Sequence, residues 1–155
     1  MSRAFVKEPD GLEAFDDLPE KRISEHRNLV TAHGLALIEA GVARHSTEQA
    51  NARTANDRAA IARASRDLRY WSHRLATAQL MPLPADTATV QFGATVTFRR
   101  TDGRQQTFKI VGEDEGDPAN GTISYVSPLA QGLLGKSAGD TVRAGPVEAE
   151  IVEIG

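Results

Sequence analysis

The chain has 155 residues, of which 40% are hydrophobic and 25% are charged, and its formal net charge is −3. These values are ordinary for a soluble globular protein of one long domain or two small ones. The absence of cysteine excludes disulfide and thiolate chemistry. No apolar run approaches the ~20 residues of a membrane span, so we expect a cytoplasmic protein with no membrane partner.

Residues 1–28 are predicted to form an irregular N-terminal arm, because they contain Pro9, Gly11 and Pro19 and show little apolar periodicity. Residues 29–81 change to helical spacing, and we predict an antiparallel coiled-coil hairpin there. Its helices are expected over residues 31–54 and 58–80, with Thr31 and Asp57 as their N-caps. The tip of the hairpin is then Asn56, Asp57 and Arg58.

The hairpin prediction rests on a seam of residues spaced alternately by three and four, mirrored about the tip. The numbers of each facing pair add to 113, from 35 with 78 at the base to 52 with 61 near the tip. Two antiparallel helices that meet on a repeat of 3.5 residues produce such a constant sum. The seam positions are Leu35, Ile38, Val42, His45, Gln49 and Ala52 on the first helix and Ile61, Ala64, Leu68, Trp71, Leu75 and Ala78 on the second.

The hairpin carries four acids and seven arginines, a local charge of +3. A mildly basic hairpin could approach nucleic acid, so indirect contact with RNA or DNA stays open. We interpret the arginines from Arg58 to Arg74 as a solvated helix face. The four histidines show no metal-ligand spacing, and we expect no metal site in the isolated chain.

Two prolines, Pro82 and Pro84, stiffen residues 82–87, which we read as a linker. Beyond it the apolar period changes to two, and residues 88–155 are predicted to form a small antiparallel β-sheet domain with a short helix. Strands are expected over residues 89–100, 107–111, 122–126, 142–143 and 147–154, and a helix over 128–134. The fold class is therefore α+β.

Three motifs of this second domain carry a family resemblance. Residues 92–96 read Phe-Gly-Ala-Thr-Val, residues 110–115 read Ile-Val-Gly-Glu-Asp-Glu, and residues 127–136 read Ser-Pro-Leu-Ala-Gln-Gly-Leu-Leu-Gly-Lys. In this order and spacing they resemble the C-terminal domain of the bacterial Gre transcription elongation factors. The chain start at Met1-Ser2-Arg3-Ala4-Phe5 is similar to that of GreB-type members, so the chain is identified as a divergent GreB-like member with a shortened coiled coil.

The resemblance implies an FKBP-like fold for the C-terminal domain and binding to RNA polymerase. The protein would act as a monomer and not as an enzyme. Its C-terminal domain would dock at the polymerase through Ser127, Pro128, Leu129 and Ala130. The hairpin would enter the secondary channel. Family members place acids at the tip that help hold a catalytic magnesium ion, so that the polymerase cleaves its own backtracked RNA. No other cofactor is implied.

This chain departs from the family at the tip. Asp57 matches the first family acid, but Ala60 stands where the second is expected. A divalent cation needs several oxygen ligands, and one carboxylate beside Arg58 is a poor donor set. Typical members also have about two more helical turns in each helix, or ~11 Å at 1.5 Å per residue. We therefore expect weak or no stimulation of transcript cleavage, with Asp57 as the one residue that could contact magnesium inside the polymerase.

Three alternatives stay open. The chain could be a true cleavage factor that acts through Asp57, with the polymerase supplying the other ligands. It could be a prolyl isomerase, although fold alone argues little and Phe92, Phe98 and Phe108 mostly alternate at expected core positions. It could also be an adaptor that grips another protein with its hairpin.

Overall fold

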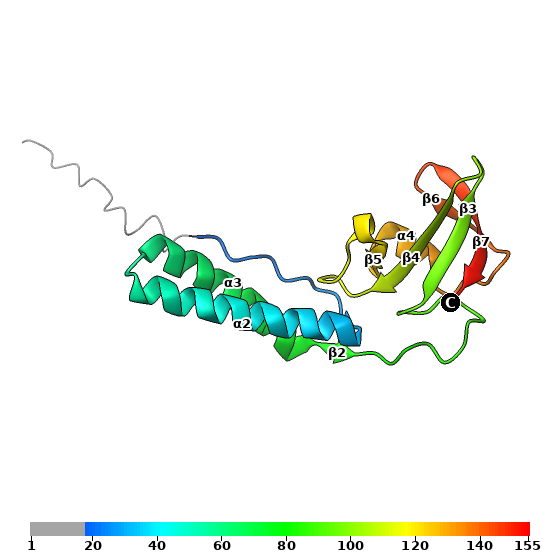
Figure 1. Cartoon of the computed structure of the whole chain (residues 1–155). Helices are drawn as coiled ribbons and strands as arrows, with labels where there is room; N and C mark the ends of the chain where they lie inside the picture. The colour runs from blue at the N-terminus through cyan, green and yellow to red at the C-terminus, as the bar shows by residue number, and fades with distance from the viewer. Residues whose placement is uncertain (1–17) are drawn as a thin grey trace, which may run out of the picture. The chain divides into compact units, whose positions relative to one another are not determined.

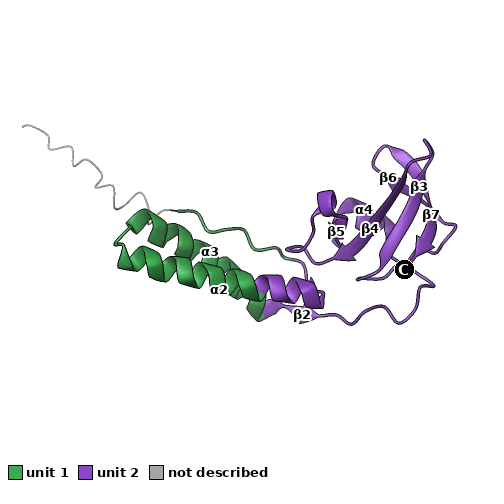
Figure 2. Ribbon diagram, viewed as in Figure 1, with its two compact units in different colours: residues 1–25, 39–76 green, residues 26–38, 77–155 purple. Residues whose placement is uncertain are grey.

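The structure is a computed structural model and describes residues 18–155. The motif from Met1 to Phe5 lies outside the described residues. The described chain forms two compact units, residues 18–25 with 39–76 and residues 26–38 with 77–155 (Figure 2). None of the described helices combines the length and the apolar character needed to cross a bilayer.

The helical hairpin consists of α2, Ala32–Thr54, and α3, Arg58–Thr77 (Figure 1). All twelve predicted seam positions are buried or half-buried, whereas most α2 residues between them are exposed. The Gln49 side-chain amide donates to the Ser65 hydroxyl at 2.9 Å, as expected when residues 49 and 64 face each other. The predicted seam and its register are confirmed.

Both predicted N-caps are confirmed, but the predicted end of the second helix is wrong. The Gly34 N–H donates to the Thr31 hydroxyl at 3.0 Å, and this hydroxyl donates to the Glu115 carboxylate at 2.7 Å. α3 ends at Thr77 and not at residue 80, because the next residues form a short strand. This strand, β2, Gln79–Leu80, pairs in parallel with β1, Leu29–Val30.

Residues 18–25 are bound to α3 by charged side chains. Glu20 accepts a hydrogen bond from Arg69 at 3.0 Å, and the Lys21 ammonium lies 3.0 Å from the Asp67 carboxylate. Arg74 is only 2% exposed and has partners within the described chain. The interpretation of these arginines as one solvated face is therefore wrong for Arg74.

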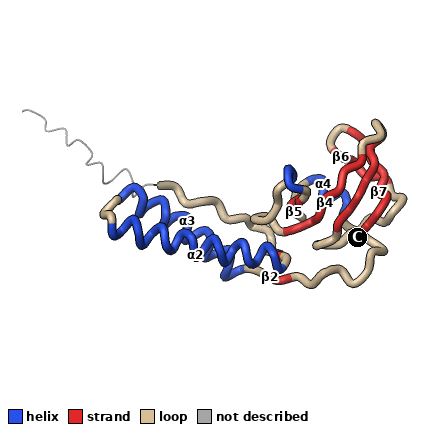
Figure 3. The backbone as a smooth tube through the Cα atoms, in the orientation of Figure 1, coloured by secondary structure: helices blue, strands red, loops and turns tan. Residues whose placement is uncertain are grey.

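The second unit contains a five-stranded sheet of order β5-β4-β3-β7-β6 (Figure 3). Phe98, Ile110, Leu133 and Ile151 lie fully buried in its core. With the helical hairpin this confirms the α+β class. The elements are β3, Thr95–Arg100; β4, Gln105–Val111; the 3-10 helix η1, Pro118–Asn120; β5, Thr122–Ser124; α4, Pro128–Leu133; β6, Thr141–Ala144; and β7, Val147–Ile154.

Two details of the predicted sheet are wrong. The first strand starts at Thr95 and not at residue 89, because Gly93 has a φ of +86° and turns the chain. The sheet is also mixed and not wholly antiparallel, since β5 runs parallel to β4 after the chain returns through η1. Val90 and Ala94 are nevertheless buried, as the alternation predicted.

Candidate functional site

The tip of the hairpin is a tight, fully exposed turn. Asn56 has a φ of 52°, in the left-handed region that asparagine tolerates better than most residues. The Asp57 N–H donates to the Ala52 carbonyl at 3.0 Å, which closes the last turn of α2. Asn56, Asp57 and Arg58 are all exposed, so the structure brings the three predicted tip residues together at the surface.

Asp57 starts α3 as its N-cap. One carboxylate oxygen accepts a hydrogen bond from the Ala60 N–H at 3.1 Å, and the Asp57 carbonyl accepts from the Ile61 N–H at 2.9 Å. A carboxylate at this position also lies favourably near the positive end of the helix dipole. Among residues 18–155 no side chain forms an ion pair with Asp57, so its second oxygen stays open to solvent or to a partner.

Two further acids, Glu48 and Asp67, line a 460 Å³ hollow that also contains Asp57. Hydrogen bonds from Arg44 and His45 hold the pKa of Glu48 below its usual value. Burial alone raises the pKa of Asp67, but hydrogen bonds from Lys21 and Arg66 outweigh it and the pKa is lowered. Both carboxylates are thus charged at neutral pH and already neutralised by cations of this chain.

The tip does not fit a magnesium ion on its own. In the described part of the chain no three histidine, aspartate or glutamate side chains come together as a metal site. Asp57 uses one oxygen as a helix cap, and Ala60 contributes only its backbone N–H. A hard divalent cation takes about six oxygen ligands, and this donor set cannot supply them.

The cap makes a testable contribution to the hairpin. We expect Asp57→Ala to destabilise the protein by about 0.5–2 kcal/mol, because the Ala60 N–H loses its acceptor. Asp57→Asn is the matched control, since asparagine caps equally well. Urea unfolding followed by circular dichroism at 222 nm measures both. Equal stability of the alanine variant and the wild type would show that the cap does not contribute to the free energy of unfolding.

The predicted docking edge is built around the start of α4. The Ser127 hydroxyl accepts from the Ala130 N–H at 3.3 Å and caps the helix, and Pro128 occupies its first turn. Pro128 is exposed, and Leu129 is half-buried against the core. Ala130 has 0% exposure and belongs to the core, so it offers no surface to a partner.

One group of residues near the start of α2 was missed by sequence reasoning. Glu115, in the loop after β4, accepts the hydrogen bond of the Thr31 hydroxyl and joins this loop to the start of α2. The same region contains an apolar pocket between residues 31–33, 80–83, 92–93 and Lys109. Leu83, between the two prolines, was an available signal but was interpreted as part of the linker of residues 82–87, and Leu80 was assigned to the end of the second helix.

Comparison with known proteins identifies the family of the C-terminal domain by a family model. The family model "Transcription elongation factor, GreA/GreB, C-term" matches residues 85–155. The chain is 38% identical over 115 residues to the transcription elongation factor GreA of Desulfovibrio desulfuricans, covering 69% of this chain and 68% of the relative. It is 49% identical over 67 residues to GreA of Hyphomonas neptunium, covering 42% of this chain.

The match spans only 43% of the length of the Hyphomonas protein. Among solved structures, GreA factor homolog 1 (Gfh1) of Thermus thermophilus is similar with a TM-score of 0.41 and 16% identity. That similarity covers 84% of this chain and 99% of the other.

Proposed function

We propose that this chain, which belongs to the GreA/GreB family of transcription elongation factors, binds bacterial RNA polymerase and modulates transcription elongation or initiation. The C-terminal domain docks on the polymerase through the edge at Ser127, Pro128 and Leu129. The hairpin enters the secondary channel with Asn56, Asp57 and Arg58 foremost. The protein works in the cytoplasm as a monomer, with no cofactor of its own.

The hairpin has the form that such a role needs. α2 contains 23 residues, so it is about 34 Å long at 1.5 Å per residue. The seam buries apolar side chains between the two helices. The exposed side of α3 is mostly polar, whereas that of α2 combines polar residues with alanines and Leu37. Its tip residues are all exposed.

The chemistry of the tip supports a modulator with weak or no cleavage stimulation. The observation that carries this proposal is the single available carboxylate: Asp57 already caps α3, and Glu48 and Asp67 are engaged by cations of the chain. The open second oxygen of Asp57 favours one alternative, a cleavage factor in which the polymerase supplies the remaining ligands.

Docking is tested at Pro128, because it is the exposed apolar residue of the edge. We expect Pro128→Glu to weaken binding to polymerase core enzyme at least about tenfold, or ~1.4 kcal/mol, by placing a charge against an apolar contact. Acidic residues are favourable in a first helical turn, so the fold should be retained. Fluorescence anisotropy with a labelled chain measures the affinity.

Pro118→Glu is the matched control. Pro118 is also exposed and also starts a short helix of the same domain, η1, but it lies outside the proposed edge. We expect this variant to bind polymerase like the wild type. If Pro128→Glu binds with unchanged affinity, the edge at α4 is not the docking surface.

A further inference from the structure

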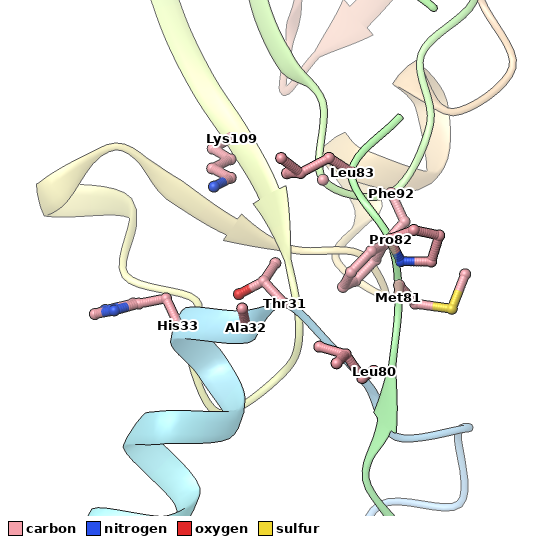
Figure 4. Close-up of a pocket in the computed structure, with 10 residues that line it drawn as sticks. Thr31, Ala32, His33, Leu80, Met81, Pro82, Leu83, Phe92 and Lys109 are labelled. Atoms are coloured by element: carbon pink, nitrogen blue, oxygen red, sulfur yellow. The ribbon is translucent and has the colours of Figure 1, made fainter. Parts of the chain in front are cut away.

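An apolar pocket of 590 Å³ lies in the unit of residues 26–38 and 77–155 (Figure 4). Four parts of the chain form it: the start of α2, the end of β2 with the residues that follow it, the residues just before β3, and β4. Its volume falls in the range of small-molecule sites, about 300–1,000 Å³. The lining residues are Thr31, Ala32, His33, Leu80, Met81, Pro82, Leu83, Phe92, Gly93 and Lys109.

Two walls of this pocket carry exposed leucine side chains. Leu80 is 57% exposed and Leu83 is 76% exposed, and they are two of the three large hydrophobic side chains that are exposed among residues 18–155. Phe92 and Met81 are half-buried beside them. Isolated exposed leucines are common, but two that face one concave site indicate a surface that a ligand covers.

One of the residues that line the pocket, Lys109, carries an ammonium group. Lys109 lies on β4 and is half-buried, and among the described residues no acid forms an ion pair or hydrogen bond with it. Figure 4 shows its nitrogen end directed towards the start of α2. The Thr31 hydroxyl donates its proton to Glu115, so Lys109 and the exposed His33 are the lining side chains that can meet an anion.

We propose that this pocket binds a small amphipathic carboxylate, with its apolar body against Leu80, Leu83 and Phe92 and its carboxylate on Lys109. The geometry is that of many ligand sites, which have mostly apolar walls and a few polar groups that fix orientation. Lys109 is a half-buried residue with no acidic partner among the described residues, and a charge pair formed there is less screened by water than one at a fully exposed lysine.

A ligand in this pocket would contact both the start of α2 and residues 80–83. These parts are linked by the short parallel pair of β1 and β2, with two residues in each strand, and by the hydrogen bond from the Met81 N–H to the Val30 carbonyl. Binding would therefore hold the base of the hairpin and the following linker segment in one arrangement. This inference does not depend on polymerase binding, and its test uses the isolated protein.

The test compares three probes with the same eight-carbon chain: octanoate, 1-octanol and octylammonium. Each is titrated into ¹⁵N-labelled protein, and amide shifts of Leu83, Phe92 and Lys109 are followed. We expect octanoate to bind tightest and octylammonium weakest. Lys109→Met keeps the apolar stem and removes the charge, so it should weaken octanoate binding roughly five- to tenfold and leave octanol binding unchanged.

Lys136→Met is the matched control, because Lys136 belongs to the same unit but lies outside the pocket. It should bind octanoate like the wild type. The proposal is overturned if octanoate causes no shifts at the pocket residues, if octanol and octanoate bind equally, or if Lys109→Met and Lys136→Met have the same effect. A folded amide spectrum of each variant excludes unfolding as the cause.

Discussion

Gly112→Ala is expected to destabilise the second unit by about 2–3 kcal/mol. A Cβ at Gly112 would lie 2.4 Å from the Leu29 carbonyl oxygen, far inside van der Waals contact. The obstructing atom belongs to the backbone of β1, so no side-chain rotation can relieve the clash. The strand or the chain at Gly112 has to move. Thermal unfolding should show a midpoint lowered by roughly 5–10 °C.

The consequence reaches further because β1 is joined to several other segments. The Gln79 N–H donates to the Asn28 carbonyl at 2.8 Å, and the Met81 N–H donates to the Val30 carbonyl at 2.9 Å. Displacing β1 would disturb these bonds and the Thr31 cap that follows directly.

Gly132→Ala provides the matched control. Gly132 lies inside α4, and a Cβ there would meet no atom within 4 Å. Alanine is favoured over glycine in a helix by up to ~1 kcal/mol, so this variant should be as stable as the wild type or more stable. Equal stability of the alanine variants at both glycines would mean that Leu29 does not approach Gly112 as described.

The hairpin could be predicted from the sequence because its information is local and repeated. Twelve seam positions and two caps all indicate the same pair of helices, and one register follows from the position of the Asn56–Asp57 turn. The end of α3 could not be predicted from the same signals. Residues 78–80 contain no helix breaker, and the strand they enter exists only because β1 lies beside it.

The sheet shows a different limit. Apolar residues alternate in the sequence from Val90 to Phe98 and predict one long strand, yet ladder pairing with β4 starts only at Thr95. Gly93 turns the chain there, so that Ala94 lies in the core whereas Phe92 is half-buried and lines the pocket. The direction of β5 was also hidden, because a strand of three residues carries no signal of whether its partner is parallel.

The candidate functional residues also include some that could be predicted from local sequence and some that could not. The cap roles of Thr31 and Asp57 could be predicted because helix caps follow from nearby sequence. The pocket at Lys109 could not be predicted, since its walls come from four separate segments of the chain. No local pattern links Thr31 to Glu115 either, although their hydrogen bond joins the start of α2 to the loop after β4.

The expected lack of cleavage stimulation has two candidate causes, the missing second acid at the tip and the short hairpin. One pair of variants distinguishes them. Ala60 lies three residues after the N-cap, where a glutamate or glutamine completes a capping box and preserves the helix start. Ala60→Glu adds an acid, and Ala60→Gln is its uncharged control. If only the glutamate variant stimulates transcript cleavage, the missing acid is the cause. If neither variant does, the length of the hairpin is the cause.

The largest functional effect is expected in competition with a conventional cleavage factor. If the hairpin occupies the secondary channel without completing a metal site, it excludes the other factor by mass action. At about ten times its dissociation constant, the wild-type chain should weaken the conventional factor's apparent affinity about tenfold. Alone, it should not stimulate cleavage of backtracked RNA. Cleavage assays on stalled elongation complexes measure both effects.

In this assay, Asp57→Ala and Pro128→Glu distinguish the effect of occupying the secondary channel from the effect of the tip carboxylate. Asp57→Ala loses the tip carboxylate but keeps the docking edge, so it should still antagonise the conventional factor, with a small loss from its weaker helix cap. Pro128→Glu keeps the tip but loses affinity, so it should antagonise only at a correspondingly higher concentration. If the wild type cleaves backtracked RNA at the rate of a conventional factor and Asp57→Ala abolishes that cleavage, the single carboxylate suffices inside the polymerase. The chain would then be a cleavage factor for which the polymerase supplies the missing ligands.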